Sequence, residues 1–190
     1  MGTYIETIAE VKTTGGWKVN EAEVFAHPIA DWDTVTEDRR PFIENPFYWQ
    51  SYGMMGFFAG IRNHSETKVL AAPRGLPEDS DENSIQALAP YGHRHDDYGW
   101  GLSGSVVQDA PKTVAQRVLE CREGLYGHSW LSAAELIGFD YDQAFIDQSE
   151  VPPAVTTYRE FLGPLYFQHV DALKKLGDPS EVRILFCFNG

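Results

Sequence analysis

Residues 3–26, TYIETIAEVKTTGGWKVNEAEVFA, decide the fold of this chain. Apolar and polar residues alternate through 3–12 and again through 17–26, and Thr13-Thr14-Gly15-Gly16 joins the two runs. A short glycine-rich link between two alternating segments is typical of a β-hairpin. At the other end of the chain, Val182 to Phe188 is an apolar, β-rich run. We expect it to pair with the N-terminal hairpin in a small antiparallel sheet.

The segments between these strands show helical patterns. Helices are predicted at 49–61, near 83–89, and at 112–123, 132–139 and 157–176, the last kinked at Gly163-Pro164. Strands at both ends with helices between them favour an α+β fold, with the helices packed on one face of the sheet. The length indicates one domain, 1–190, with irregular insertions near 27–47 and 90–125. Exposed edges of such a sheet can pair across a dimer, so a homo-oligomer is expected.

The chain carries a formal net charge of −13. This charge argues against duplex DNA or RNA and against an anionic membrane as partners, because each needs a basic face. A small anion in a local pocket remains open, since a few placed donors can outweigh the global field. The N-terminus lacks a signal-peptide pattern, and no apolar run is long enough to span a bilayer. Cys121 and Cys187 lie in dissimilar settings, so we expect no structural disulfide and a cytoplasmic protein.

The segment Pro73-Arg74-Gly75-Leu76-Pro77 predicts a rigid loop that presents one cation. The prolines restrict φ on either side of Arg74, and Gly75 allows a turn with positive φ. An arginine fixed in this way suits a phosphate or carboxylate, because its guanidinium offers a planar fork of donors. A surface turn whose arginine is solvated or salt-bridged explains the same residues equally well.

The segment Gly127-His128-Ser129-Trp130-Leu131-Ser132 precedes a predicted helix. Ser132 and Glu135 match the S-x-x-E capping box, so the helix is expected to start near Ser132. The first amides of a helix favour an anion, and His128 lies just ahead of them in the sequence. A ligand contact by His128 is one interpretation. A hydrogen-bonded structural histidine, with Ser132 acting only as a cap, is the other.

Other chemistry-bearing motifs are weak. The segment His93-Arg94-His95-Asp96-Asp97 resembles a metal site, but no second ligand pair has matching spacing, so we expect no bound metal. The chain lacks a G-x-S-x-G elbow, a Walker loop and a G-x-G-x-x-G fingerprint, and no cofactor is expected.

Several segments, in order along the chain, resemble a widespread family of small tailed-phage proteins. They are Tyr52, Ala59-Gly60-Ile61-Arg62-Asn63, the 73–77 loop and His128-Ser129-Trp130-Leu131-Ser132. Family members carry an R-N-Y-x-L-F-A-x-L-A-G-V-R-N helix, a P-R-G-L-P loop and a W-x-x-D-x-H-S-x-S-W-L segment. Here Gln50 and Ser51 stand where the family has Arg-Asn, and Gly53 where it has Asp. The resemblance covers most of the chain.

By analogy, this resemblance implies a phage anti-defence protein that binds and sequesters a nucleotide immune signal, such as a cyclic dinucleotide or a cyclic ADP-ribose variant. The expected ligand-binding residues are Tyr52, Arg62, Asn63, Arg74, Gly75, Leu76, His128, Ser129, Trp130 and Ser132. Two alternatives remain open. One is a metal-independent phosphodiesterase with His128 as general acid or base, and the other is an acidic interaction protein that blocks a host factor. Binding is preferred, because hydrolysis normally needs two acid–base groups and only His128 is placed in the candidate site.

Overall fold

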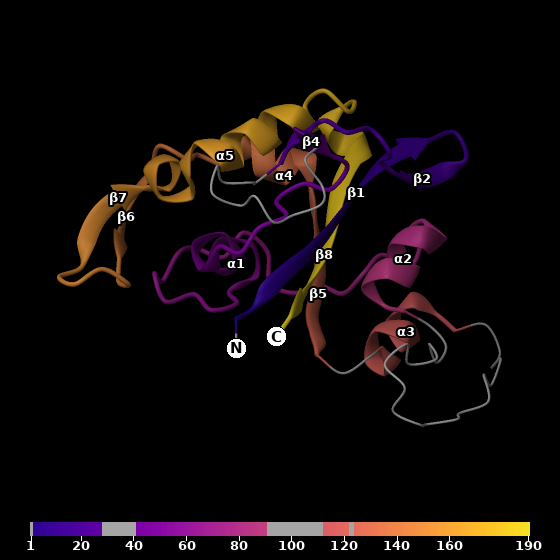
Figure 1. Cartoon of the computed structure of the whole chain (residues 1–190), viewed down its shortest axis with the longest axis horizontal. Helices are drawn as coiled ribbons and strands as arrows, with labels where there is room; N and C mark the ends of the chain where they lie inside the picture. Colours follow the sequence, from indigo (N-terminus) through magenta and orange to yellow (C-terminus); the bar gives the residue numbers. More distant parts are fainter. Residues whose placement is uncertain (1, 28–40, 91–111, 122–123) are drawn as a thin grey trace.

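A four-stranded antiparallel sheet forms the centre of the molecule in the computed structural model, which describes residues 2–27, 41–90, 112–121 and 124–190 (Figure 1). The strand order is β2-β1-β8-β5. The strands are β1 (Tyr4–Thr13), β2 (Gly16–Val19), β5 (Leu125–Ser132) and β8 (Val182–Asn189). The first and last strands pair along almost their whole lengths, from Tyr4 opposite Asn189 to Val11 opposite Val182. The α+β fold, the N-terminal hairpin and its pairing with the C-terminal strand are therefore confirmed.

The central strand β8 is buried on both faces of the sheet. Ile184, Phe186 and Phe188 belong to one apolar core, and Leu185 and Cys187 belong to a second core on the opposite side. This double burial explains why the strand is a continuous apolar run without alternation.

Helices cover both faces of the sheet, so the prediction that they pack on one face is wrong. The larger core lies under α1 (Tyr52–Ala59), α4 (Ala133–Gly138) and α5 (Tyr158–Leu173). The smaller core lies under α2 (Glu82–Leu88) and α3 (Val114–Glu120), which Figure 1 shows on the other side of β8. A strand with apolar side chains on both faces must be covered twice.

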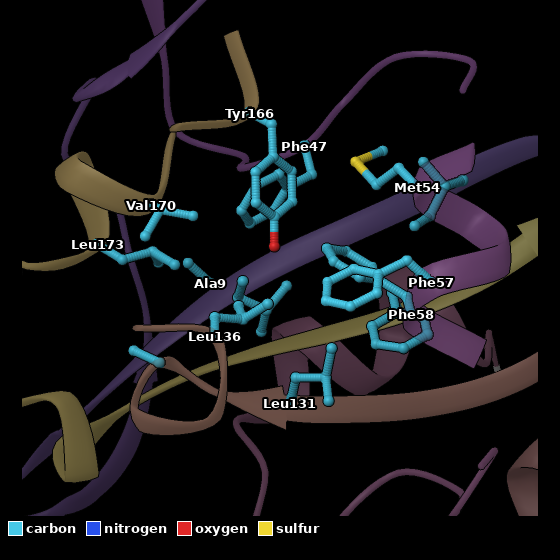
Figure 2. Packing of buried hydrophobic residues seen from close by; sticks show 14 of the residues in the cluster. Ala9, Phe47, Met54, Phe57, Phe58, Leu131, Leu136, Tyr166, Val170 and Leu173 are labelled. Carbon is cyan, nitrogen blue, oxygen red and sulfur yellow. The ribbon is translucent and has the colours of Figure 1, made fainter. Parts of the chain in front are cut away.

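Aromatic rings dominate the larger core. Figure 2 shows Tyr166 among Phe47, Phe57 and Phe58, with its hydroxyl pointing into the cluster. That hydroxyl lies 2.8 Å from the hydroxyl of Tyr141, which in turn donates to a backbone carbonyl of α4. The buried phenol is thus hydrogen-bonded, as a polar group in an apolar core must be. Burial raises the pKa of Tyr141 to about 12, which keeps this pair neutral.

The strand β5 was not predicted from the sequence, which placed residues 127–131 only just ahead of a helix. Glycine, histidine and serine are not strong strand formers. Pairing with the edge of β8, from Leu125 to Ser132, overrides this weak local preference, with an irregularity between Tyr126 and Ser129. The predicted strand 17–26 is also split. Its end forms β3 (Phe25–Ala26), which pairs with β4 (Phe42–Ile43) outside the main sheet.

The sequence signals for the start of α4 and the kink of α5 agree with the structure better than the strand predictions do. Ser132 and Glu135 form the predicted capping box at the start of α4. The kink of α5 lies at Gly163, whose φ of 75° and ψ of 172° are not helical. A short 3-10 turn, η1 (Pro179–Glu181), leads into β8. Most of the two predicted insertions, 27–47 and 90–125, lies outside the described residues.

A second hairpin, β6 (Ala144–Asp147) and β7 (Ala154–Thr157), extends away from the sheet beside α5 (Figure 1). None of the helices in the described part of the chain is both long and apolar enough to cross a membrane. Cys187 is buried and Cys121 is partly exposed.

Candidate functional site

The 73–77 loop lies along the outer edge of β5, so the structure brings the two predicted motifs together. The backbone N–H of Gly75 donates to the carbonyl oxygen of His128 at 3.0 Å, and the N–H of Arg74 donates to Oγ of Ser129 at 3.2 Å. Gly75 has a φ of 75°, the left-handed conformation that the loop sequence predicted. Leu76 turns inward and is buried in the smaller core. The loop therefore covers an edge that would otherwise expose unpaired backbone groups.

The positive charge of the Arg74 guanidinium is neutralised within the protein by a carboxylate. The guanidinium lies 4.5 Å from the centre of the Trp130 ring and donates to Oε1 of Glu135 at 2.8 Å. The other carboxylate oxygen, Oε2, accepts from the backbone N–H of Ser132 at 2.8 Å. Desolvation opposes ionisation of Glu135, but the hydrogen bonds from Arg74 and Ser132 outweigh it and lower the pKa. Arg74 is thus held by an ionised carboxylate.

His128 points into the protein. The residue is only 5% exposed, and its Nε2 lies 2.9 Å from the carbonyl oxygen of Leu88. Because a carbonyl only accepts, Nε2 carries the proton and donates it. Burial lowers the pKa of His128, so the ring is neutral near pH 7. Sγ of Cys121 lies 3.9 Å from the same nitrogen. The histidine thereby joins the end of α2 to β5.

The two serines of this segment are also engaged within the protein. Oγ of Ser129 is buried and accepts from the backbone of the 73–77 loop. Oγ of Ser132 accepts from the N–H of Glu135 at 3.1 Å and donates to its carboxylate at 3.0 Å. We call the set Arg74, Gly75, Leu76, His128, Ser129, Trp130, Ser132 and Glu135 the Arg74 cluster. Its polar side chains bind mainly one another and the backbone.

A second group of predicted residues gathers elsewhere, beside the start of β1. Nε of Arg62 donates to Oγ1 of Thr3 at 3.2 Å, and its guanidinium lies 6.0 Å from the centre of the Tyr52 ring. The Tyr52 side chain is 39% exposed. The ring of His64 lies 6.4 Å from that of Tyr52, and the hydroxyl of Tyr126 lies 3.4 Å from Oγ1 of Thr3. We call these residues, Thr3, Tyr52, Arg62, His64 and Tyr126, the Arg62 corner.

Within the described residues, no carboxylate lies at ion-pair distance from Arg62. This arginine therefore combines an exposed cation with two exposed phenol rings nearby. An anion with a planar ring can use both features, the charge for a phosphate and a phenol face for the ring.

Asn63 has a structural role next to this corner. Its Oδ1 accepts from the N–H and the hydroxyl of Thr67, both at 2.9 Å, and its Nδ2 donates to the carbonyl of Thr67 at 2.9 Å. Gly56 of α1 packs against the same amide, since a Cβ there would lie 2.7 Å from Oδ1. Asn63 holds the turn that orients Arg62, whose own φ is 52°.

Sequence reasoning missed Thr3, His64 and Tyr126. They come from the residue just before β1, a turn and β5, and the fold alone brings them together, so no local signal marks them. Among the described residues, no cluster of three or more His, Cys, Asp or Glu side chains is placed to hold a metal ion. The His93 and His95 pair lies outside the described residues.

Comparison of the chain with protein-family models, with curated proteins and with solved structures finds no match in any of the three. The assignment of function therefore depends on the chemistry of the two groups above and on the motif resemblance.

Proposed function

We propose that this protein binds and sequesters a small anionic nucleotide, of the cyclic nucleotide or cyclic ADP-ribose type, and acts as a phage anti-defence protein in the host cytoplasm. The observation that carries nucleotide binding is the Arg62 corner, where an arginine with no carboxylate partner among the described residues lies beside exposed phenol rings. The anti-defence role is supported by the motif resemblance alone.

The chemistry of the corner suits a nucleotide. The guanidinium of Arg62 is permanently charged and can donate two parallel hydrogen bonds to a phosphate. Tyr52 offers a ring face for a nucleobase, and such stacking contributes about 1–3 kcal/mol per base. Thr3 already fixes Nε of Arg62, so less side-chain freedom is lost when a ligand binds.

Binding without cleavage is favoured over a metal-independent phosphodiesterase. In that alternative, His128 exchanges a proton with the substrate. Its Nε2 proton is instead donated to a backbone carbonyl, and burial lowers its pKa away from the imidazolium form. A general acid or base must reach the reacting group, and this histidine is 5% exposed.

The test is calorimetric titration of the purified protein with cyclic dinucleotides, cyclic mononucleotides and cyclic ADP-ribose. Arg62→Ala is expected to weaken binding at least about tenfold, because a charge-assisted hydrogen bond contributes roughly 1.5–3 kcal/mol. Arg159→Ala is the matched control. Arg159 is also exposed and lies 4.8 Å from an aromatic ring, that of Phe167, but it is paired with Asp142. Its loss is expected to leave affinity unchanged.

The fate of the ligand separates the hypotheses. After long incubation and heat denaturation, a sequestering protein releases the nucleotide intact. Conversion of excess nucleotide to a linear product by catalytic amounts of protein contradicts sequestration. Failure of every tested nucleotide to bind contradicts nucleotide binding itself, and equal affinities of wild type and Arg62→Ala remove the Arg62 corner as the site.

A further inference from the structure

A chain of hydrogen bonds runs through the Arg62 corner and ends at an exposed hydroxyl. Oγ1 of Thr3 accepts from Nε of Arg62 at 3.2 Å and lies 3.4 Å from the hydroxyl of Tyr126. Thr3 is fully buried, so its own hydroxyl proton needs an acceptor inside the protein. Among the described residues, the Tyr126 oxygen is its one partner besides Arg62. Thr3 therefore donates to Tyr126, and the phenol proton of Tyr126 is left for a ligand.

The same chain of bonds decides which part of Arg62 a ligand can use. Nε donates to Thr3, so the two Nη groups at the end of the guanidinium remain as donors. Such a pair matches two oxygens of one phosphate group. The ring of Tyr126 packs against that of Phe188, with ring centres 6.0 Å apart, and is 37% exposed. This packing holds the Tyr126 hydroxyl next to Thr3 and therefore close to Arg62.

The corner supplies one permanent positive charge. In the described part of the chain, every other arginine forms an ion pair with a carboxylate: Arg74 with Glu135, Arg117 with Glu82, Arg159 with Asp142, and Arg183 with Glu10. The lysine nearest in sequence, Lys68, has its ammonium 5.8 Å from the ring of Phe139. A second negative charge on a ligand therefore meets no cation among the described residues of the corner, and the net charge of −13 repels it.

We infer that the ligand of the Arg62 corner has a single phosphodiester group, bound by the Nη groups of Arg62 and the hydroxyl of Tyr126, as in a cyclic mononucleotide. This inference rests on the proposed function and narrows it. A phosphodiester has one negative charge, which the guanidinium balances. A terminal phosphate carries about 1.5–2 negative charges at pH 7, and cyclic dinucleotides and cyclic ADP-ribose have two phosphate groups. Tyr52 then stacks on the single base.

The choice of ligand tests the charge. Calorimetric titration compares the cyclic mononucleotide, the cyclic dinucleotide and the nucleoside monophosphate of adenine and of guanine, together with cyclic ADP-ribose. For at least one base, the cyclic mononucleotide is expected to bind at least about tenfold more tightly than every other ligand. If another ligand binds as tightly and loses affinity in Arg62→Ala, the proposed function stands and this inference is overturned. If no nucleotide binds, both are overturned.

Tyr126→Phe tests the second donor, because it removes the hydroxyl and keeps the ring against Phe188. Affinity for the cyclic mononucleotide is expected to fall at least about threefold, since a hydrogen bond to the phosphate is lost. Tyr4→Phe is the matched control. Tyr4 is 57% exposed and precedes Ile5 of the larger core, so its side chain lies on the other face of the sheet. Equal affinities of Tyr126→Phe and the wild type overturn the inference.

Thr3 is a positioning residue, because it holds both donors without reaching the ligand. Thr3→Val keeps the shape of the side chain and removes the hydroxyl, so affinity is expected to fall at least about threefold. Thr3→Ser keeps the hydroxyl and is expected to bind like the wild type. Thermal unfolding shows whether each variant is folded. Equal losses in the two folded variants attribute the effect to packing and contradict the chain of hydrogen bonds, as does wild-type affinity in Thr3→Val.

An added charge tests why one phosphate is preferred. The ring of His64 lies 6.4 Å from that of Tyr52, so His64→Arg adds a permanent cation to the corner. The affinity for the cyclic dinucleotide, relative to that for the cyclic mononucleotide, is expected to rise at least about threefold. Leu119→Arg adds the same charge at an 86% exposed position on α3, over the opposite face of the sheet, and is expected to leave this ratio unchanged. An unchanged ratio in His64→Arg, or an equal rise in both variants, overturns the charge argument and the inference with it.

Discussion

Arg62 and Arg74 both lie against aromatic rings, yet their surroundings differ. Arg74 is 4.5 Å from Trp130 and is neutralised by Glu135, whereas Arg62 is 6.0 Å from Tyr52 and, in the described residues, has no acidic partner. The loop that carries Arg74 is the more conspicuous motif in the sequence. In the structure this loop covers the edge of β5. The less conspicuous Arg62 is the arginine that has no carboxylate partner among the described residues. The residues of a specific motif thus have a structural role here that their chemistry alone does not reveal.

The difference follows from how polar groups are satisfied. A buried or half-buried donor that finds its partner within the fold stabilises that fold and has little left for a ligand. An exposed cation with one neutral partner can still gain a charge-assisted bond from an anion. We therefore expect substitutions in the Arg74 cluster to change stability, and substitutions in the Arg62 corner to change binding.

The largest effect is expected for Leu76→Ala, which removes the buried anchor of the 73–77 loop. Leu76 is 8% exposed and packs in the core beneath α2 and α3. Truncation of a buried leucine costs about 2–5 kcal/mol of the free energy of unfolding. Leu119→Ala, at an exposed position, is expected to cost less than about 0.5 kcal/mol. Urea denaturation measures both values. A Leu76→Ala variant of normal stability that fails to bind nucleotide reverses the roles of the two regions.

Much of the fold is predictable because its signals are local. The glycine-rich turn after Thr13 indicates the first hairpin, Ser132 and Glu135 indicate the start of α4, and Gly163 before Pro164 indicates the kink in α5. Each signal depends on residues only a few positions apart. The physics that forms these features acts over the same short range.

The remaining features depend on contacts between distant segments. The strand β5 forms because β8 offers it an edge, although its own residues favour a loop. In the candidate site, Thr3 and Tyr126 are separated by 123 positions and meet only in the folded chain. The sequence identifies both Arg62 and Arg74 as candidates for binding an anion. Only the structure shows that Arg62 is bonded to the neutral Thr3, whereas Arg74 is bonded to the carboxylate of Glu135.

The next largest effect concerns pH and His128. Burial lowers the pKa of this histidine below its ordinary value of 6.5, so the unfolded chain binds the proton more readily. Its contribution to stability is fully present above pH 6.5 and is lost as the pH falls through the lower pKa of the folded state. His128→Gln keeps an amide donor for the carbonyl of Leu88 and removes the titration.

The stability of His128→Gln is therefore expected to fall less steeply than that of the wild type below pH 6.5, as urea denaturation at a series of pH values can measure. His169 contributes with the same sign, because burial lowers its pKa to about 4, so some dependence on pH remains in the variant. Identical slopes for the two proteins contradict the structural role of His128. Normal nucleotide affinity in the variant is expected as well, since His128 belongs to the Arg74 cluster.

The smallest effect gives the sharpest test of the comparison, because it converts one kind of arginine into the other. Glu135→Gln preserves the capping box, in which glutamine is also favoured, but removes the negative charge that faces Arg74. Stability is expected to change by less than about 1 kcal/mol. The guanidinium of Arg74 then resembles that of Arg62, an uncompensated cation over an aromatic ring.

In an Arg62→Ala background, Glu135→Gln is expected to restore weak nucleotide binding, a few-fold above that of Arg62→Ala alone, in calorimetric titration. Glu160→Gln supplies the control, because Glu160 occupies the same capping-box position in α5 and has no arginine partner at ion-pair distance within the described residues. Equal gains from both glutamine substitutions attribute the effect to lower net charge, and only a gain confined to Glu135→Gln shows that its carboxylate keeps Arg74 from binding anions.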